Sequence, residues 1–100
     1  MNPVELHIDM ISHLCSTHRV NKLYLFGSTL TDQFNQESDI DLIVDFSPMD
    51  LSLYAENYYN LKFSLQKLLG RQVDLLELKG IRNPVLKQQL DHTKKLIYGY

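Results

Sequence analysis

The chain has 100 residues, of which 44% are apolar and 22% are charged, and its formal net charge at pH 7 is -2. This length and composition predict a single domain over residues 1–100 that buries a core of its own, and they exclude a disordered chain. Because no basic run is longer than Lys94-Lys95, the sequence lacks the positive surface that a nucleic-acid backbone requires, and nucleic acid is disfavoured as the main ligand.

The first predicted element is a helix that begins after Asn2, a residue type that caps helices, with Pro3 at its first position. Its apolar residues recur at intervals of three or four as far as Thr17. They are Val4, Ile8, Ile11 and Cys15. This periodicity predicts one helix that packs a single face against the core.

Two predicted strands follow the first helix. Leu23–Phe26 is a short apolar run that stops at Gly27, and Ser28–Gln33 is compatible with one or two helical turns. The run Ile40–Phe46 reads as a second strand, which Ser47-Pro48 ends because proline restricts the residue before it.

The longest predicted helix runs from Asp50 to Leu69 and ends at Gly70. Its apolar residues are spaced four, three, four and three apart, as an amphipathic helix requires. They are Tyr54, Tyr58, Leu61, Leu65 and Leu68.

The last third of the chain predicts one more strand and one more helix. Gln72–Leu78 reads as a strand, Lys79-Gly80 as a turn, and Asn83-Pro84 as the cap and first residue of a helix. That helix is expected to present Leu86, Leu90, Thr93 and Ile97 on one face. Strands alternating with helices predict an α/β fold, with a small mixed sheet of at least three strands and helices packed against it.

The cysteine content and the N-terminal sequence predict a cytoplasmic protein. Cys15 is the only cysteine, and the first residues have neither the basic nor the apolar region of a signal peptide. The apolar stretches are far shorter than the ~20 residues that span a bilayer. We therefore expect no disulfide and no membrane association.

Two carboxylates separated by one residue, Asp39 and Asp41, are the most informative feature of the sequence. If the chain is extended from Ser38 to Phe46, both side chains face the same way, with Cα atoms roughly 6.6 Å apart. Two like charges at the start of an apolar strand repel each other and are costly to bury. A divalent cation removes this penalty, and Mg²⁺ typically binds one or two carboxylates together with substrate phosphates.

A tight turn and a third carboxylate complete the predicted site. Gly27 permits a close backbone approach, Ser28 adds a hydroxyl, and the backbone N–H groups of such a turn suit a phosphate. Asp74 stands second in an apolar strand, where an acidic residue is costly without a cation. Three carboxylates at strand starts can hold two divalent ions roughly 3.5 to 4 Å apart. The pattern predicts phosphoryl or nucleotidyl transfer.

Gly27-Ser28 followed ten residues later by Asp39-Ile40-Asp41 resembles the signature of the DNA polymerase beta-like nucleotidyltransferase superfamily. The chain length and the segment Gly70–Leu76 resemble its minimal nucleotidyltransferase branch, and the resemblance covers nearly the whole chain. It implies that Asp39 and Asp41 ligate two Mg²⁺ ions and that Asp74 is the third catalytic and metal-binding carboxylate. It also implies that Gly27 and Ser28 hold the triphosphate of ATP.

The resemblance further implies a biological role. Proteins of this branch are often antitoxins that pair with a HEPN-family RNase toxin and add AMP from ATP to a tyrosine of that toxin. The chain is therefore expected to be a metal-dependent nucleotidyltransferase that acts on a hydroxyl of a protein partner, with which it can form an oligomer.

One departure from the superfamily pattern favours an alternative. Many members carry arginines directly after the Gly-Ser pair, whereas this chain has Thr29-Leu30-Thr31-Asp32. Without those charges, a protein that neutralises its partner by occlusion, with weak or no catalysis, is the second hypothesis. A third reading, a glycosyltransferase metal site, conflicts with the short chain and with the Gly-Ser spacing.

Overall fold

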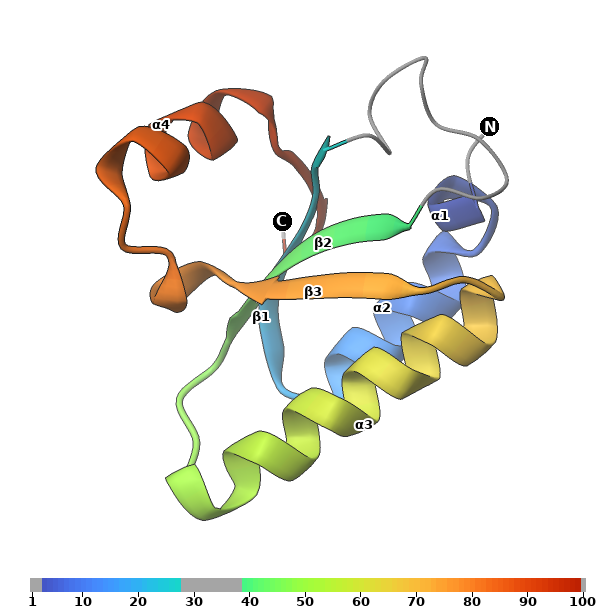
Figure 1. The fold of residues 1–100 in the computed structure, drawn as a ribbon. Helices are drawn as coiled ribbons and strands as arrows, with labels where there is room; N and C mark the ends of the chain where they lie inside the picture. The colour runs from blue at the N-terminus through green and yellow to red at the C-terminus, as the bar shows by residue number, and fades with distance from the viewer. Residues whose placement is uncertain (1–2, 28–38, 100) are drawn as a thin grey trace.

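Four strands form one sheet in the part of the chain that the computed structural model describes, residues 3–27 and 39–99. The strands are β1 (Val20–Leu25), β2 (Ile40–Phe46), β3 (Val73–Glu77) and β4 (Lys95–Tyr98), in the order β3-β2-β1-β4. β1 is antiparallel to both of its neighbours, whereas β2 and β3 are parallel. The prediction of a small mixed sheet with helices packed against it is confirmed (Figure 1).

The helices lie on both sides of this sheet (Figure 1). α1 (Pro3–Leu6), α2 (Ile8–Thr17) and α3 (Leu51–Leu69) lie on one side, and α4 (Pro84–Thr93) lies on the other. A short 3-10 helix, η2 (Leu78–Gly80), connects β3 to α4. No helix among the described residues is long and apolar enough to cross a membrane.

The main core fills the space between the sheet and α1 to α3. Alternate residues of β2 face it, since Ile40, Leu42 and Val44 are fully buried in one cluster with helix residues. The helix residues of this cluster include Val4, Ile11, Cys15, Leu61, Leu65 and Leu69. Each fully buried aliphatic side chain contributes about 1.5–3 kcal/mol relative to an exposed one, so this layer dominates the stability of the fold. The odd-numbered residues of β2 face the other side of the sheet.

Several predicted elements are confirmed. β2 has the predicted bounds, and α3 ends at Gly70, whose φ of 66° is left-handed. The Asn83 side chain caps α4 by accepting hydrogen bonds from the backbone N–H groups of Val85 and Leu86, at 3.0 and 3.2 Å. Cys15 is buried in the core, as its position in the apolar pattern predicts.

Other predictions were wrong. The first helix is interrupted at His7, which has non-helical dihedral angles, and β1 begins at Val20 rather than Leu23. The last helix ends at Thr93, and Ile97 lies on a fourth strand instead of on the helix. Lys94 adopts an extended conformation with ψ of 146°, which turns the chain out of α4 and into β4. The predicted turns over Ser28–Gln33 lie outside the described residues.

Candidate active site

Two carboxylates occupy paired positions at the start of two neighbouring strands. Asp41 of β2 and Asp74 of β3 are direct partners in the parallel register, one residue after the pair Ile40 and Val73. Paired residues of neighbouring strands project from the same face, with the strands about 4.8 Å apart. The structure therefore brings together two of the three predicted carboxylates, on the face of the sheet opposite the main core.

The strand starts that carry these carboxylates are fixed by backbone contacts. The Ile40 N–H donates to the Gln72 carbonyl at 3.0 Å, which aligns the two strands at their first residues. The Val73 N–H donates to Oε1 of Gln66 on α3 at 3.2 Å. The register that pairs Asp41 with Asp74 thus depends on hydrogen bonds within the sheet and to α3.

The remaining predicted carboxylate, Asp39, lies just before β2 and is exposed. Asp74 is also exposed, whereas Asp41 is half-buried. Among the described residues, no three His, Cys, Asp or Glu side chains are close enough together to hold a metal ion. The prediction that Asp39, Asp41 and Asp74 ligate two ions therefore stays a prediction.

The donor set nonetheless fits a hard divalent cation. Asp41 and Asp74 offer only oxygen atoms, from one face of two adjacent strands. Mg²⁺ prefers oxygen donors and is commonly held by one or two carboxylates, with substrate phosphates and water completing its octahedral shell. The oxygen atoms of Asp41 and Asp74 are therefore donors of the kind that such a cation prefers.

Gly27 lies directly against the Asp41 carboxylate. Its φ is +70°, and a Cβ atom built on it would be 2.5 Å from Oδ2 and 3.1 Å from Cγ of Asp41. The neighbouring Phe26 N–H donates to the Asp41 carbonyl at 3.1 Å. The turn after the first strand was expected near Asp39 and Asp41, and the structure places Gly27 beside Asp41, where only glycine fits. Ser28 lies outside the described residues, so its contact with phosphate stays a prediction.

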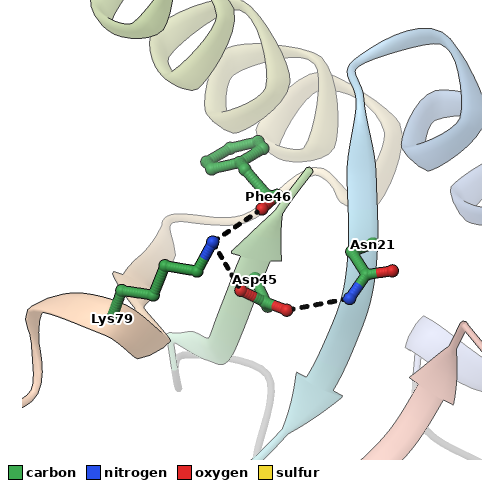
Figure 2. Close-up of polar contacts among 4 residues, drawn as sticks. All are labelled: Asn21, Asp45, Phe46 and Lys79. Atoms are coloured by element: carbon green, nitrogen blue, oxygen red, sulfur yellow. Dashed lines mark hydrogen bonds and ion pairs between the residues drawn. The ribbon is translucent and has the colours of Figure 1, made fainter. Parts of the chain in front are cut away.

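Asp45, four residues along β2 from Asp41, has a structural role (Figure 2). Its Oδ2 accepts a hydrogen bond from Nδ2 of Asn21 at 2.9 Å, and its Oδ1 lies 3.6 Å from Nζ of Lys79. Lys79 Nζ also donates to the Phe46 carbonyl at 3.2 Å. Since the Oδ1 contact is too long for a hydrogen bond, Lys79 compensates this largely buried oxygen by charge alone. From the sequence, Asp45 was expected to be either solvent-exposed or part of a structural pair, and the structure shows the pair.

Two tyrosines of α3 support the edge of the sheet that carries Asp74. The Tyr58 hydroxyl donates to the Leu75 carbonyl at 2.5 Å. Burial raises the pKa of Tyr58, and the nearby charges of Tyr59, Asp74 and Glu77 raise it further. Burial also raises the pKa of Tyr54, with a hydrogen bond to Glu77 as the next cause. Both phenols therefore stay neutral at physiological pH and act as hydrogen-bonding supports of β3.

The same face of the sheet holds residues that the sequence analysis did not identify. Leu23 and Leu25 belong to the main core, so Tyr24 between them points to the opposite face, where it pairs with Ile43 of β2. Lys94 Nζ lies 4.6 Å from the centroid of the Tyr24 ring. From the sequence, Lys94 was expected inside the last helix. The β-branched and aromatic residues Ile97 and Tyr98 were the signal for a strand.

Known proteins similar to this chain are nucleotidyltransferases. Residues 9–100 match the model of the polymerase beta nucleotidyltransferase family. MJ1379 of Methanocaldococcus jannaschii, a candidate protein adenylyltransferase by name, is 37% identical over 81% of this chain and 78% of its own length. The protein adenylyltransferase MntA of Thermococcus cleftensis is 30% identical over 71% of this chain and 69% of its own.

Solved structures share the fold. A structure described as a candidate minimal nucleotidyltransferase has a TM-score of 0.77 and 27% identity, and the match covers 95% of both chains. A toxin–antitoxin with AMP-PNP has a TM-score of 0.72 and 27% identity, covering 93% of this chain and 73% of the other. A complex of an MNT antitoxin with a tri-AMPylated HEPN toxin of Shewanella oneidensis has a TM-score of 0.65 and 26% identity, covering 96% and 72%.

Proposed function

The chain belongs to the polymerase beta nucleotidyltransferase family, and from this membership we propose that it transfers AMP from ATP to a hydroxyl group of a protein partner, using Mg²⁺. The observation that carries the proposal is the pairing of Asp41 with Asp74 on parallel strands, with Gly27 against the Asp41 carboxylate. Two carboxylates and a close backbone turn are what a phosphate-transferring site needs to hold a cation and a nucleotide together.

Asp39 and Asp41 would hold Mg²⁺, with Asp74 as the third ligand. When bound, the cation neutralises charge on the phosphates and lowers the pKa of the attacking hydroxyl. Gly27 leaves room beside Asp41 because it carries no side chain. With Ser28, it would form the turn whose N–H groups and hydroxyl bind the triphosphate.

Asp74 would accept the proton in the transfer step. The hydroxyl oxygen of the acceptor forms a bond to the α-phosphorus of ATP while the bond from that phosphorus to the bridging oxygen breaks. The bonding electron pair leaves with pyrophosphate, and the hydroxyl proton passes to the Asp74 carboxylate. Asp74 suits this role because it is exposed on an edge strand, where a partner protein can reach it.

The proposed acceptor is a tyrosine of a HEPN-family toxin, which makes the chain the antitoxin of a toxin–antitoxin pair. Support comes from the adenylyltransferase names of the relatives and from the structural similarity to an antitoxin bound to an AMPylated HEPN toxin. A similar structure that contains AMP-PNP supports ATP as the donor.

The test is to incubate the purified protein with α-labelled ATP, Mg²⁺ and the protein encoded by the neighbouring gene. We expect label on the neighbour with the wild type and with Asp50→Asn, and none with Asp39→Asn or Asp41→Asn. Asp50 is a matched control because it is an exposed carboxylate at the start of α3 whose side chain makes no capping hydrogen bond. A neighbour left unlabelled by the wild type would refute the proposal.

A second function, neutralisation of the partner by occlusion, is favoured by the absence of arginine from Thr29-Leu30-Thr31-Asp32. It predicts that Asp39→Asn combined with Asp41→Asn still protects cells from the toxin. If this double variant binds the partner and fails to neutralise it, occlusion is not sufficient.

A further inference from the structure

Lys94 is a cation held on the same face of the sheet as the paired carboxylates. Its Nζ lies over the Tyr24 ring at 4.6 Å and contacts Oδ1 of Asp91 at 2.6 Å. The Lys94 side chain is only 16% exposed, against 48% for the Asp91 side chain. Lysine is usually among the most exposed residue types, so this ammonium group is held against the sheet rather than extended into solvent.

The strand register relates Lys94 to Asp41. Tyr24 pairs with Ile43, which is two residues along β2 from Asp41 and faces the same side. Two residues after Tyr24, the Phe26 N–H donates to the Asp41 carbonyl, so Phe26 and Asp41 lie opposite each other. Tyr24 is therefore offset from Asp41 by two residue pairs, roughly 7 Å along the strands, and lies on the neighbouring strand.

A nucleotide bound at Asp41 and Asp74 brings the negative charge of a triphosphate to this face. The segment from Gly27 to Asp45 contains no lysine or arginine, and it carries five acidic residues: Asp32, Glu37, Asp39, Asp41 and Asp45. This segment cannot balance the phosphates, so their charge must be met by metal ions and by cations from other parts of the chain. Lys94 meets this need because α4 and β4 bring it to the correct face of the sheet.

We propose that Lys94 binds the β- and γ-phosphates of the nucleotide, an inference that rests on the proposed function. The α-phosphate reacts at the carboxylates, so the outer phosphates are the part of the nucleotide free to extend along the sheet toward Tyr24. A lysine ammonium group binds phosphate as a compact point charge on a flexible stem. In the absence of nucleotide, Asp91 pairs with Lys94. When nucleotide binds, the ammonium group leaves the half-exposed Asp91 carboxylate and pairs with the phosphates instead.

Binding measurements on charge variants test the proposal without relying on catalysis. The affinities for AMP-PNP with Mg²⁺ and for AMP are measured by calorimetry. We expect Lys94→Met to weaken AMP-PNP binding by about tenfold to a hundredfold and AMP binding far less, because AMP lacks the outer phosphates. Lys94→Arg should restore most of the affinity, and Asp91→Asn should leave it unchanged or raise it.

Lys95→Met is the matched control. Lys95 is the next residue, its side chain is 59% exposed, and its Nζ lies 3.8 Å from Oε1 of Glu5 on α1, which lies on the opposite side of the sheet. It should bind AMP-PNP like the wild type. The inference is refuted if Lys94→Met retains wild-type affinity, or if it loses affinity for AMP and AMP-PNP alike, which would indicate a structural role.

A second test uses the wild-type protein, so that folding of a variant is not at issue. An acyl-phosphate derivative of ATP transfers its acyl group to an amine next to the terminal phosphate. We expect peptide mapping to find the label on Lys94, with excess ATP preventing it. Label confined to other lysines would overturn the inference. If the wild type binds AMP-PNP and Lys94 is not involved, only this inference fails, whereas a wild type that binds no nucleotide refutes the proposed function itself.

Discussion

Asp41 and Asp74 lie opposite each other on parallel strands β2 and β3, each one residue into its strand. Thirty-two residues of the sequence and the whole of α3 separate them, and the parallel register alone brings them to one face. Two carboxylates on neighbouring strands repel each other, and a bound cation removes this repulsion. This pair is therefore the centre of the proposed site.

The two carboxylates should differ in their effects on binding and on transfer. Asp41→Asn removes a proposed metal ligand, so it should weaken Mg²⁺-dependent binding of AMP-PNP. Asp74→Asn removes the proposed proton acceptor and one of the three proposed metal ligands, so it should slow transfer by about 10²–10⁴-fold and weaken binding less than Asp41→Asn does. Calorimetry and single-turnover kinetics separate the two effects. Asp74→Asn with a wild-type transfer rate would contradict the assignment.

Substitution of Gly27 should damage the site more than the fold. Gly27 and Gly70 both have left-handed φ, +70° and +66°, so alanine at either position should cost about 1–2 kcal/mol of stability. At Gly70 nothing lies within 4 Å of the added Cβ, whereas at Gly27 that atom meets the Asp41 carboxylate. Gly27→Ala should therefore also reduce transfer, by about a hundredfold through displacement of Asp41, while Gly70→Ala should not.

Urea denaturation and transfer assays on both glycine variants check this prediction. Equal transfer rates for the two alanine variants would show that the space beside Asp41 is not needed for activity.

Removal of the Lys79 charge should destabilise the protein. Lys79 compensates the buried Oδ1 of Asp45, and the Asp45 side chain is only 15% exposed. Because the Lys79 side chain is itself 61% exposed, solvent screening limits the expected loss for Lys79→Met to about 1 kcal/mol. The pair of Lys95 and Glu5 has both side chains well exposed, so Lys95→Met should cost less than half as much. Urea unfolding of both variants tests the ranking, which fails if Lys95→Met is the more destabilised.

Stability should fall at alkaline pH. Burial raises the pKa of the Cys15 thiol from 9.0 to about 12, and it also raises those of Tyr54 and Tyr58. Each group is protonated in the folded state over a pH range in which the unfolded chain ionises. Their contribution to stability is therefore complete below pH ~9 and is lost as pH rises toward the folded pKa values.

Urea unfolding at a series of pH values from neutral to strongly alkaline should show this loss. Tyr58→Phe removes one titrating group, so its free energy of unfolding should decline less steeply than that of the wild type. A wild-type stability that stays constant through pH ~11 would be inconsistent with the raised pKa values of the buried Cys15 and the half-buried Tyr54 and Tyr58.

The sequence predicted the parts of the fold that have strong local signals. Ile40–Phe46 is a mainly apolar run, and the strand was predicted with its correct bounds. Gly70 and Asn83 are residue types with specific capping geometries, so the end of α3 and the start of α4 were also predicted correctly. Ile97 was placed wrongly because it follows Leu90 by seven residues, a spacing that fits two turns of a helix. The strand Lys95–Tyr98 is only four residues long, and its pairing with β1 comes from tertiary contacts that local patterns do not contain.

The residues of the candidate site could be predicted from the sequence, but their positions relative to one another could not. Gly27, Asp41 and Asp74 were identified by spacing and by the cost of acidic residues in apolar strands. Their proximity depends on the strand order β3-β2-β1 and on a parallel register, which arise from packing across the whole chain. Lys94 was missed because its relation to Tyr24 exists only once the chain leaves α4 and turns into β4.

The most direct test of the central claim, that Asp41 and Asp74 form one catalytic unit, is a double-mutant cycle on the single-turnover rate of AMP transfer. Asp41→Asn, Asp74→Asn and the double variant are compared with the wild type under saturating ATP and Mg²⁺. If the two carboxylates act together, the double variant should be no slower than the slower single variant. Losses that multiply, or a single variant that retains the wild-type rate, would contradict the claim.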